Sequence, residues 1–144
     1  MTTRRAVSSG SPWEGPYGYS RAVVLGDHCW VAGTTDPSDD HPGDPAAQAN
    51  AAFGIVERAL DEAGFALTDV VRTRMYVTDA AFAAPVAEVH GRLFGAIRPA
   101  ATLVVVSALI EPGLLVEVEV DAARDPARPS GETGRGLSAR GETR

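Results

Sequence analysis

The sequence contains no lysine, and all 13 of its basic residues are arginine. Chemistry that needs a lysine amine, such as Schiff-base formation with a carbonyl substrate, is therefore excluded. Cysteine is almost absent too, because Cys29 stands alone. An intrachain disulfide is impossible and a thiolate metal cluster is not expected. The simplest role for Cys29 is that of a small buried hydrophobic residue in a strand.

Long apolar runs and an excess of positive charge are also missing. No apolar run approaches the ~20 residues that a membrane-spanning helix needs. No apolar stretch follows Arg4 and Arg5, as it would in a secretory signal. The formal net charge of −6 repels the phosphates of nucleic acids. We therefore expect a cytoplasmic protein without a membrane or nucleic-acid partner.

Metal-binding patterns are absent as well. His28 and His41 have no ligand spacing with each other or with a carboxylate, whereas a zinc site needs such a cluster. We expect neither a metal nor any other cofactor.

The composition is that of a chain with one folded domain. Its 144 residues, 44% hydrophobic and 22% charged, suffice for a single core. Residues 1–12 are predicted to be a flexible N-terminus and residues 13–123 the folded domain. Residues 124–144 are rich in glycine, serine, proline and arginine with one leucine. Such a segment buries too little apolar surface to offset its ordering entropy, which predicts a disordered tail.

Hydrophobic periodicity predicts two helices. The first covers residues 45–63, where Asp44 can cap the N-terminus and Gly64 can end the helix. Its apolar residues recur at helical spacing and form one stripe. The second begins at residue 80 or 81 and ends at 94 or 95, with Pro85 in its first turn, where proline is tolerated.

Runs of β-branched and apolar residues predict five strands, at 21–25, 28–32, 70–77, 102–109 and 114–122. Gly26 and Asp27 join the first two as a hairpin turn. The resulting order is strand, strand, helix, strand, helix, strand, strand. In the last strand Glu117, Glu119 and Asp121 alternate with valines and share one face. On this pattern alone the face is most simply solvated.

Several short segments, in the right order, resemble the signature of the Rid (YjgF) family. They are Gly18-Tyr19-Ser20-Arg21-Ala22-Val23, Val31-Ala32-Gly33-Thr34-Thr35, the helix opened by Gln48-Ala49, residues 71–79, Arg98-Pro99-Ala100, and Val116-Glu117-Val118-Glu119. The resemblance covers roughly residues 13–123. It implies an α+β, chorismate-mutase-like subunit, with a mixed six-stranded sheet and two helices on one face. It also implies a homotrimer with sites in the clefts between subunits.

The resemblance also assigns site residues. In imine deaminases of the family, an arginine and a backbone N–H bind the substrate carboxylate, a glutamate holds water and a tyrosine closes the pocket. By motif, Tyr19, Gly33 and Glu117 match the tyrosine, the N–H donor and the glutamate, whereas Ala101 stands where the arginine would be. Losing one partner of such a pair costs roughly 2–5 kcal/mol. Either another cation serves, or the ligand lacks that carboxylate, or the protein is not this enzyme.

Two arginines are candidate replacements for the missing one. Arg21 would share a strand face with Tyr19, since residues two apart do so; the alternative is a surface or inter-subunit ion pair. Arg98 precedes Pro99, near the position of Ala101; the alternative is a loop arginine paired with a nearby acid.

The remaining candidates are Thr34, whose hydroxyl would lie beside Gly33, and His90, which the match puts near pocket-lining positions. A core or interface position is the alternative for His90. Glu117 could act as a general base if burial raises its pKa. The expected function is water addition to a reactive enamine, imine or related carbonyl metabolite at an inter-subunit site. The alternatives are a non-catalytic trimer that binds small molecules and, against the acidic charge, an RNA-cleaving or translation-inhibiting protein.

Overall fold

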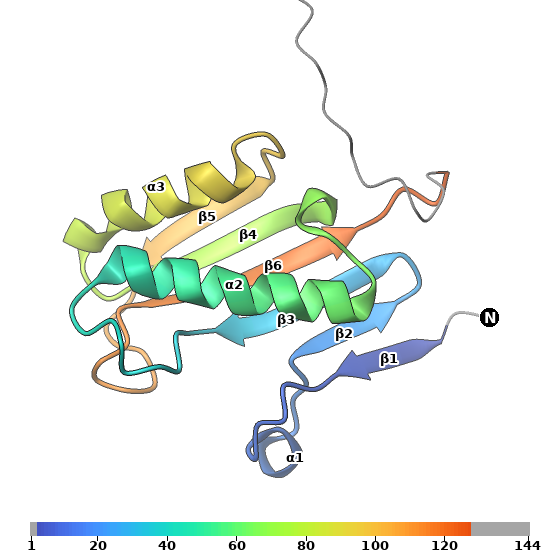
Figure 1. Cartoon of the computed structure of the whole chain (residues 1–144), viewed down its shortest axis with the longest axis horizontal. Helices are drawn as coiled ribbons and strands as arrows, with labels where there is room; N and C mark the ends of the chain where they lie inside the picture. The colour runs from blue at the N-terminus through green and yellow to red at the C-terminus, as the bar shows by residue number, and fades with distance from the viewer. Residues whose placement is uncertain (1–2, 128–144) are drawn as a thin grey trace, which may run out of the picture.

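The computed structural model describes residues 3–127, which form a six-stranded mixed sheet in the order β1-β2-β3-β6-β4-β5 (Figure 1). The strands are β1 (Arg4–Val7), β2 (Ala22–Leu25), β3 (His28–Thr34), β4 (Val70–Val77), β5 (Ala100–Val105) and β6 (Val116–Ala123). The helices are α1 (Glu14–Tyr17), α2 (Pro45–Ala63) and α3 (Ala83–Phe94), with 3-10 turns at Leu67–Asp69 and Ala80–Phe82. Of the strand pairs within residues 3–127, only β4–β5 is parallel. The expected α+β fold is confirmed.

The first predicted helix forms with the predicted caps. The Asp44 side chain accepts a hydrogen bond from the Ala47 backbone N–H at 3.0 Å, and Pro45 occupies the first helical position. Gly64 adopts the left-handed conformation (φ 83°) that ends the helix. The apolar stripe of α2, including Phe53 and Leu60, is fully buried against the sheet.

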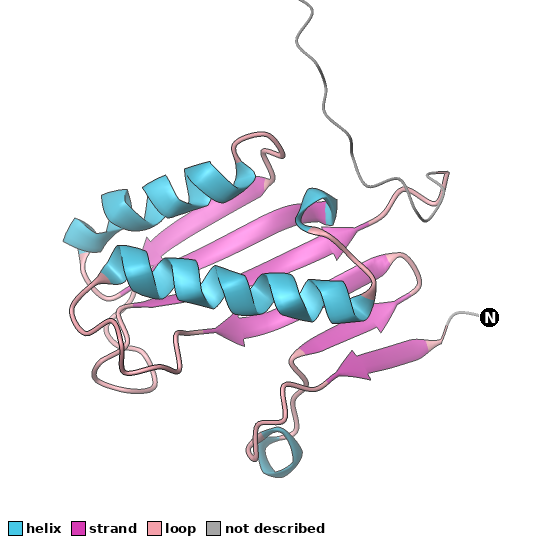
Figure 2. Cartoon of the chain, viewed as in Figure 1, coloured by secondary structure: helices cyan, strands magenta, loops and turns pink. Residues whose placement is uncertain are grey.

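The second predicted helix starts as a 3-10 turn and becomes α3 at Ala83, so that Pro85 lies in its first turn as expected. Its apolar residues Val86, Val89 and Phe94 are buried. Both long helices lie over the same face of the sheet (Figure 2). Among residues 3–127, neither is long and apolar enough to cross a membrane.

Four of the five predicted strands lie close to their predicted bounds, but β5 does not. It spans Ala100–Val105 rather than residues 102–109. The Val106 N–H still donates to the Val77 carbonyl at 2.8 Å, and the chain then leaves the sheet in a loop before β6. Because β4 ends at Val77, apolar residues further along the chain have no strand to pair with.

The predicted flexible N-terminus is wrong in part, because residues 4–7 form the edge strand β1. Arg5 donates to the Ala63 carbonyl at 2.8 Å, and Val7 is buried. Arg124, placed in the predicted tail, is also held: its guanidinium lies 4.1 Å from the ring centre of Phe65. Residues 128–144 of that tail lie outside the described residues.

The two faces of the sheet differ in chemistry. In β6, Val116, Val118 and Val120 point toward the helices and are fully buried, as strand alternation requires. Glu117, Glu119 and Asp121 therefore project from the other face, here called the open face. No element of residues 3–127 is layered on the open face in Figures 1 and 2.

Candidate functional site

Glu117 packs directly against the backbone of Gly33. β3 and β6 pair at Val31–Val120 and Thr34–Val118, so β3 carries one extra residue between these pairs. This irregularity is a β-bulge, a feature that commonly redirects groups near sites. A Cβ atom on Gly33 would overlap with Oε1 of Glu117. Glycine is therefore required at residue 33 if Glu117 is to keep its position.

Arg21, the residue before β2, contacts Gly33. Its guanidinium donates to the Gly33 carbonyl at 2.7 Å, and its Nε is buried without a hydrogen-bond partner in the described part of the chain. Burial lowers the pKa of Arg21, while the negative charges of Tyr19, Glu14 and Glu117 act in the opposite direction. The structure thus brings Arg21, Gly33 and Glu117 together.

The environment of Glu117 favours its protonated form. Burial raises the pKa of Glu117 above its ordinary value, the neighbouring Glu119 carboxylate raises it further, and the Arg21 guanidinium opposes both. A carboxylate with a raised pKa is a stronger base than an exposed one and can accept a proton from water nearer neutral pH.

Aromatic side chains project from the segment before β2. Tyr19 is 40% exposed and its hydroxyl donates to Ser11 at 3.4 Å. Trp13 and Tyr17 stack on each other with ring centres 5.5 Å apart and are 57% and 72% exposed. This segment leads directly into Arg21, which follows Tyr19 by two residues.

Thr34 and His90 do not share a face with Glu117. Thr34 is buried, pairs with Val118 on the helix side and donates to the Ala32 carbonyl at 2.8 Å. His90 is hydrogen-bonded to Thr73 at 2.8 Å and packs against Phe53 and Phe94.

Burial lowers the pKa of His90, as expected for an imidazole among apolar groups. Within one chain, His90 is thus a residue of the helix-side core. Its surroundings are those of the core position given above as the alternative to a pocket-lining one.

Ala101 is also remote from Glu117 within one chain. It pairs with Thr73 and so faces the helix side, whereas Glu117 pairs with Tyr76, which pairs with Val104. Two strand spacings and three residues along the strand separate Ala101 from Glu117, roughly 14 Å. Arg98 lies at the end of α3, exposed, with a positive φ of 57°. A single chain does not bring either residue to Glu117.

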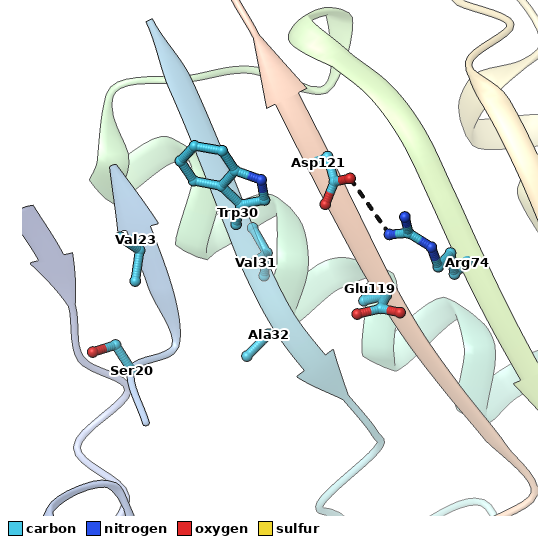
Figure 3. A pocket seen from close by; sticks show the side chains of 8 residues that line it. All are labelled: Ser20, Val23, Trp30, Val31, Ala32, Arg74, Glu119 and Asp121. Carbon is cyan, nitrogen blue, oxygen red and sulfur yellow. Dashed lines mark hydrogen bonds and ion pairs between the residues drawn. The ribbon is translucent and has the colours of Figure 1, made fainter. Parts of the chain in front are cut away.

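A hollow of about 460 Å³ lies on the open face, and its lining includes Ser20 and Ala32, the residues before Arg21 and Gly33 (Figure 3). It is lined by Ser20, Val23, Trp30, Val31, Ala32, Arg74, Glu119 and Asp121. Arg74 pairs with Asp121 at 3.4 Å, and the Tyr76 hydroxyl donates to Glu119. Sequence reasoning missed Trp30, although its alternation with buried Cys29 and Val31 puts it on this face.

The structure gives no other group suited to covalent or metal chemistry in residues 3–127. No three His, Cys, Asp or Glu side chains there are placed to hold a metal ion. Cys29 is fully buried, and burial raises the pKa of its thiol to about 11, which leaves it protonated at neutral pH.

A family model and a solved structure match most of this chain. The family model described as "Endoribonuclease L-PSP" matches residues 14–124. A crystal structure from Mycobacterium tuberculosis, described as a member of the highly conserved YjgF/YER057c/UK114 family, is 52% identical with a TM-score of 0.79. That likeness covers 85% of this chain and all of the other.

Two curated relatives are similar over most of the chain. An uncharacterized protein of Streptomyces coelicolor is 42% identical over 123 residues, 83% of this chain and 92% of that protein. A RutC family protein of Pyrococcus abyssi is 34% identical over 111 residues, 74% of this chain and 87% of that protein.

Proposed function

Because the chain belongs to the YjgF/Rid family, we propose that it adds water to a reactive enamine, imine or related carbonyl metabolite. The sites would lie between the subunits of a homotrimer. The observation that carries this proposal is the contact between the half-buried Glu117 carboxylate and the Gly33 backbone, with Arg21 beside it.

Glu117 acts as the base in the proposed reaction. It takes a proton from water while the water oxygen bonds to the imine carbon and the C=N π electron pair moves to nitrogen, and the carboxylic acid so formed gives this proton to the nitrogen, which leaves a carbinolamine. The carboxylate then takes the proton of the new hydroxyl group and passes it to the amine nitrogen while the C–N bond breaks, so that the carbonyl forms and ammonia leaves. The Gly33 N–H would donate to negative charge on the substrate, and Tyr19 would close the pocket.

Arg21 supplies the positive charge in this proposal. It lies on the Glu117 side of the sheet and already contacts Gly33, whereas the position of Ala101 could reach a Glu117 site only from a neighbouring subunit. A substrate with a negative group would be bound by the Arg21 guanidinium, which suits bidentate contact with a carboxylate.

The open face supports association of subunits. Trp30, Leu25 and Val104 are at least 40% exposed there. Glu117, Glu119 and Asp121 on the same face repel phosphates, which makes it unsuited to RNA. A second chain would cover the apolar residues and enclose the carboxylates.

The test is ammonia release from freshly generated imines and enamines. Wild type should release ammonia faster than buffer, and Glu117→Gln, which keeps the shape but not the base, should lose at least about 100-fold in rate. Glu62→Gln, on the exposed surface of α2, is the matched control and should behave as wild type. Wild-type rates in Glu117→Gln would remove Glu117 from the reaction.

Non-catalytic binding of a small molecule is the second candidate, and the observation that favours it is Ala101 in place of the family's arginine. Stable 2-keto acids and aromatic acids should then raise the melting temperature without turnover. Ala101→Arg separates the two functions: it should increase ammonia release from 2-imino acids if the rest of the site is catalytic. Binding of stable acids with no turnover in either protein would support the binding function.

A further inference from the structure

A second hollow, of about 510 Å³, lies at the end of the sheet where β3 ends and β6 begins. It is formed by the loop of residues 36–43, by Gln48 on α2 and by the loop of residues 111–115. Asp36, only 3% exposed, lies at its base. Its Oδ1 accepts from the Ser38 hydroxyl at 2.7 Å, and its Oδ2 is 2.7 Å from His41 Nδ1. His41 itself is partly exposed to the hollow.

Hydrogen bonds continue from this pair to β6. Gln48, which is buried, donates to the carbonyls of His41 and Gly113, each at 3.1 Å. Its side-chain oxygen accepts from the Leu115 N–H at 2.9 Å. Asp36 follows Gly33 by three residues, and Leu115 precedes Glu117 by two. The chain Asp36–His41–Gln48–Leu115 therefore connects the backbone after Gly33 with the backbone before Glu117.

We infer that Asp36 and His41 are a positioning pair, which fixes Gly33 against Glu117 and holds them most firmly when His41 is protonated. The kinetic consequence rests on the proposed function, but the structural consequence does not. The contact between Gly33 and Glu117 leaves no room for a Cβ atom. A small shift of either strand end would therefore change the position of the carboxylate, and errors of about 1 Å in such positions can cost roughly 100-fold in rate.

The charges around His41 favour its protonated form. Those that face it or line the hollow with it are all acidic: Asp36, Asp39 and Asp40 of its own loop, Asp44 at the start of α2 and Glu111 of the loop before β6. The hydrogen bond that His41 donates to Asp36 raises the pKa of His41 above its ordinary 6.5, and the charges of Asp36, Asp40 and Asp44 add to this. Burial would raise the pKa of Asp36, but the hydrogen bonds of His41 and Ser38 outweigh it and lower that pKa.

The pH window follows from these directions. A histidine whose pKa is raised on folding contributes its full stabilisation below the unfolded value of about 6.5 and loses it as the pH rises through the folded pKa. Neutral His41 can keep its Nδ1–H bond to Asp36 but loses the charge attraction. The positioning effect should thus be strongest at and below pH 6.5 and decline above it.

The first experiment measures the pair directly by proton NMR of the histidine Cε1–H signals. His41 should titrate above 6.5 in wild type and return toward 6.5 in Asp36→Asn, which keeps the shape of the side chain. His28, exposed and stacked on Trp30, is the internal control, and its signal should be the same in both proteins at each pH. A His41 pKa at or below 6.5, or one that Asp36→Asn leaves unchanged, would overturn the inference.

The second experiment uses His41→Asn, whose amide can still donate to Asp36 but cannot become charged, with His28→Asn as the matched control. A pH titration followed by carboxyl 13C NMR should give a Glu117 pKa that differs from wild type in His41→Asn and is unchanged in His28→Asn. For the proposed reaction, kcat/KM of His41→Asn should fall about 10-fold below pH 6.5 and approach wild type at high pH. His41→Ala should be impaired at every pH.

These readouts separate the two proposals. If no substrate is turned over but the Glu117 pKa responds to His41, the proposed reaction fails and the positioning pair stands. If turnover depends on Glu117 but His41→Asn changes neither the pKa of Glu117 nor the pH profile of kcat/KM, the inference of a positioning pair is wrong and the proposed reaction stands.

Discussion

The two faces of one sheet are built from the same strands but differ in what surrounds them. On the helix side, valines of β6 lie beneath Phe53 of α2, with nearly every side chain enclosed. On the open face, the intervening residues are Glu117, Glu119 and Asp121, which are partly open to water, and polar partners hold Glu119 and Asp121. Because side chains alternate between the two faces of a strand, one face of β6 belongs to the hydrophobic core and the other carries the residues of the proposed site. Substitutions on the two faces should therefore have different effects.

The largest expected effect on stability belongs to the helix side. Phe53→Ala removes a fully buried ring that packs on Phe94 and should lower the free energy of unfolding by about 3–5 kcal/mol. Urea denaturation measures it. Trp30→Ala on the open face, where the ring is 42% exposed, should cost the unassociated chain less than about 1 kcal/mol. Equal losses from the two substitutions would contradict the division between the faces.

The sequence predicted the helix side better than the open face, for a physical reason. α2 has local signals: Asp44 as cap, Gly64 as stop and an apolar stripe between them. The fold and Glu117 came from the family resemblance, since alternation alone gives a solvated face. The family resemblance puts His90 near the pocket; the core position that is its alternative depends on Thr73 of β4 lying across from it, which helical spacing does not show.

The strand β1 shows a second reason why part of the fold is not predicted from the sequence. An edge strand tolerates charge and needs little apolar surface, so β1, which contains Arg4 and Arg5, lacks the apolar pattern by which a strand is predicted. The contact of Glu117 with Gly33 depends on a bulge in strand pairing, and the Asp36–His41 bond depends on loop conformation. Neither has a local sequence signal of the kind that caps a helix.

Gly33→Ala is expected to have the next largest effect on stability. Residue 33 of β3 is the point at which the side chain of Glu117, on the open face, packs against the backbone. The added Cβ would overlap with Glu117 and should cost about 1–3 kcal/mol of stability, as overpacking does. In Glu117→Ala the same substitution should cost much less, because the carboxylate is gone. Chemical denaturation of the two single variants and the double variant measures this coupling. Additive losses would show that the two residues do not touch.

Trp30→Glu tests the association proposed for the open face. The new carboxylate would lie beside Asp121, its partner across β3 and β6, and a second subunit that covers this face would have to bury the added unpaired negative charge, which is costly. We expect the variant to dissociate at a protein concentration at least about 10-fold higher than that at which wild type dissociates, which is about 100-fold in the dissociation constant of a trimer. Sedimentation velocity over a concentration series measures it, with Leu25→Ser as a milder variant on the same face. A wild-type protein that is monomeric at all concentrations would contradict the proposed homotrimer.

The smallest expected effect comes from Glu119→Gln, which removes one charge and keeps the shape of the side chain. The Glu119 carboxylate raises the pKa of Glu117, after burial, so its neutralisation should lower the pKa of Glu117. Glu117 would then stay ionised to lower pH, and the acidic limb of kcat/KM should move to lower pH with it. Carboxyl 13C NMR measures the same shift without substrate.

The sign of the accompanying stability change distinguishes the charge effect from a loss of packing. A carboxyl group whose pKa is raised on folding favours the folded state at low pH and loses that contribution as the pH rises through the folded pKa. Lowering the pKa of Glu117 should thus make Glu119→Gln relatively more stable at neutral pH than at pH 4. Loss of the hydrogen bond from Tyr76 would instead destabilise the variant most at neutral pH, because an ionised carboxylate is a stronger acceptor than a neutral group.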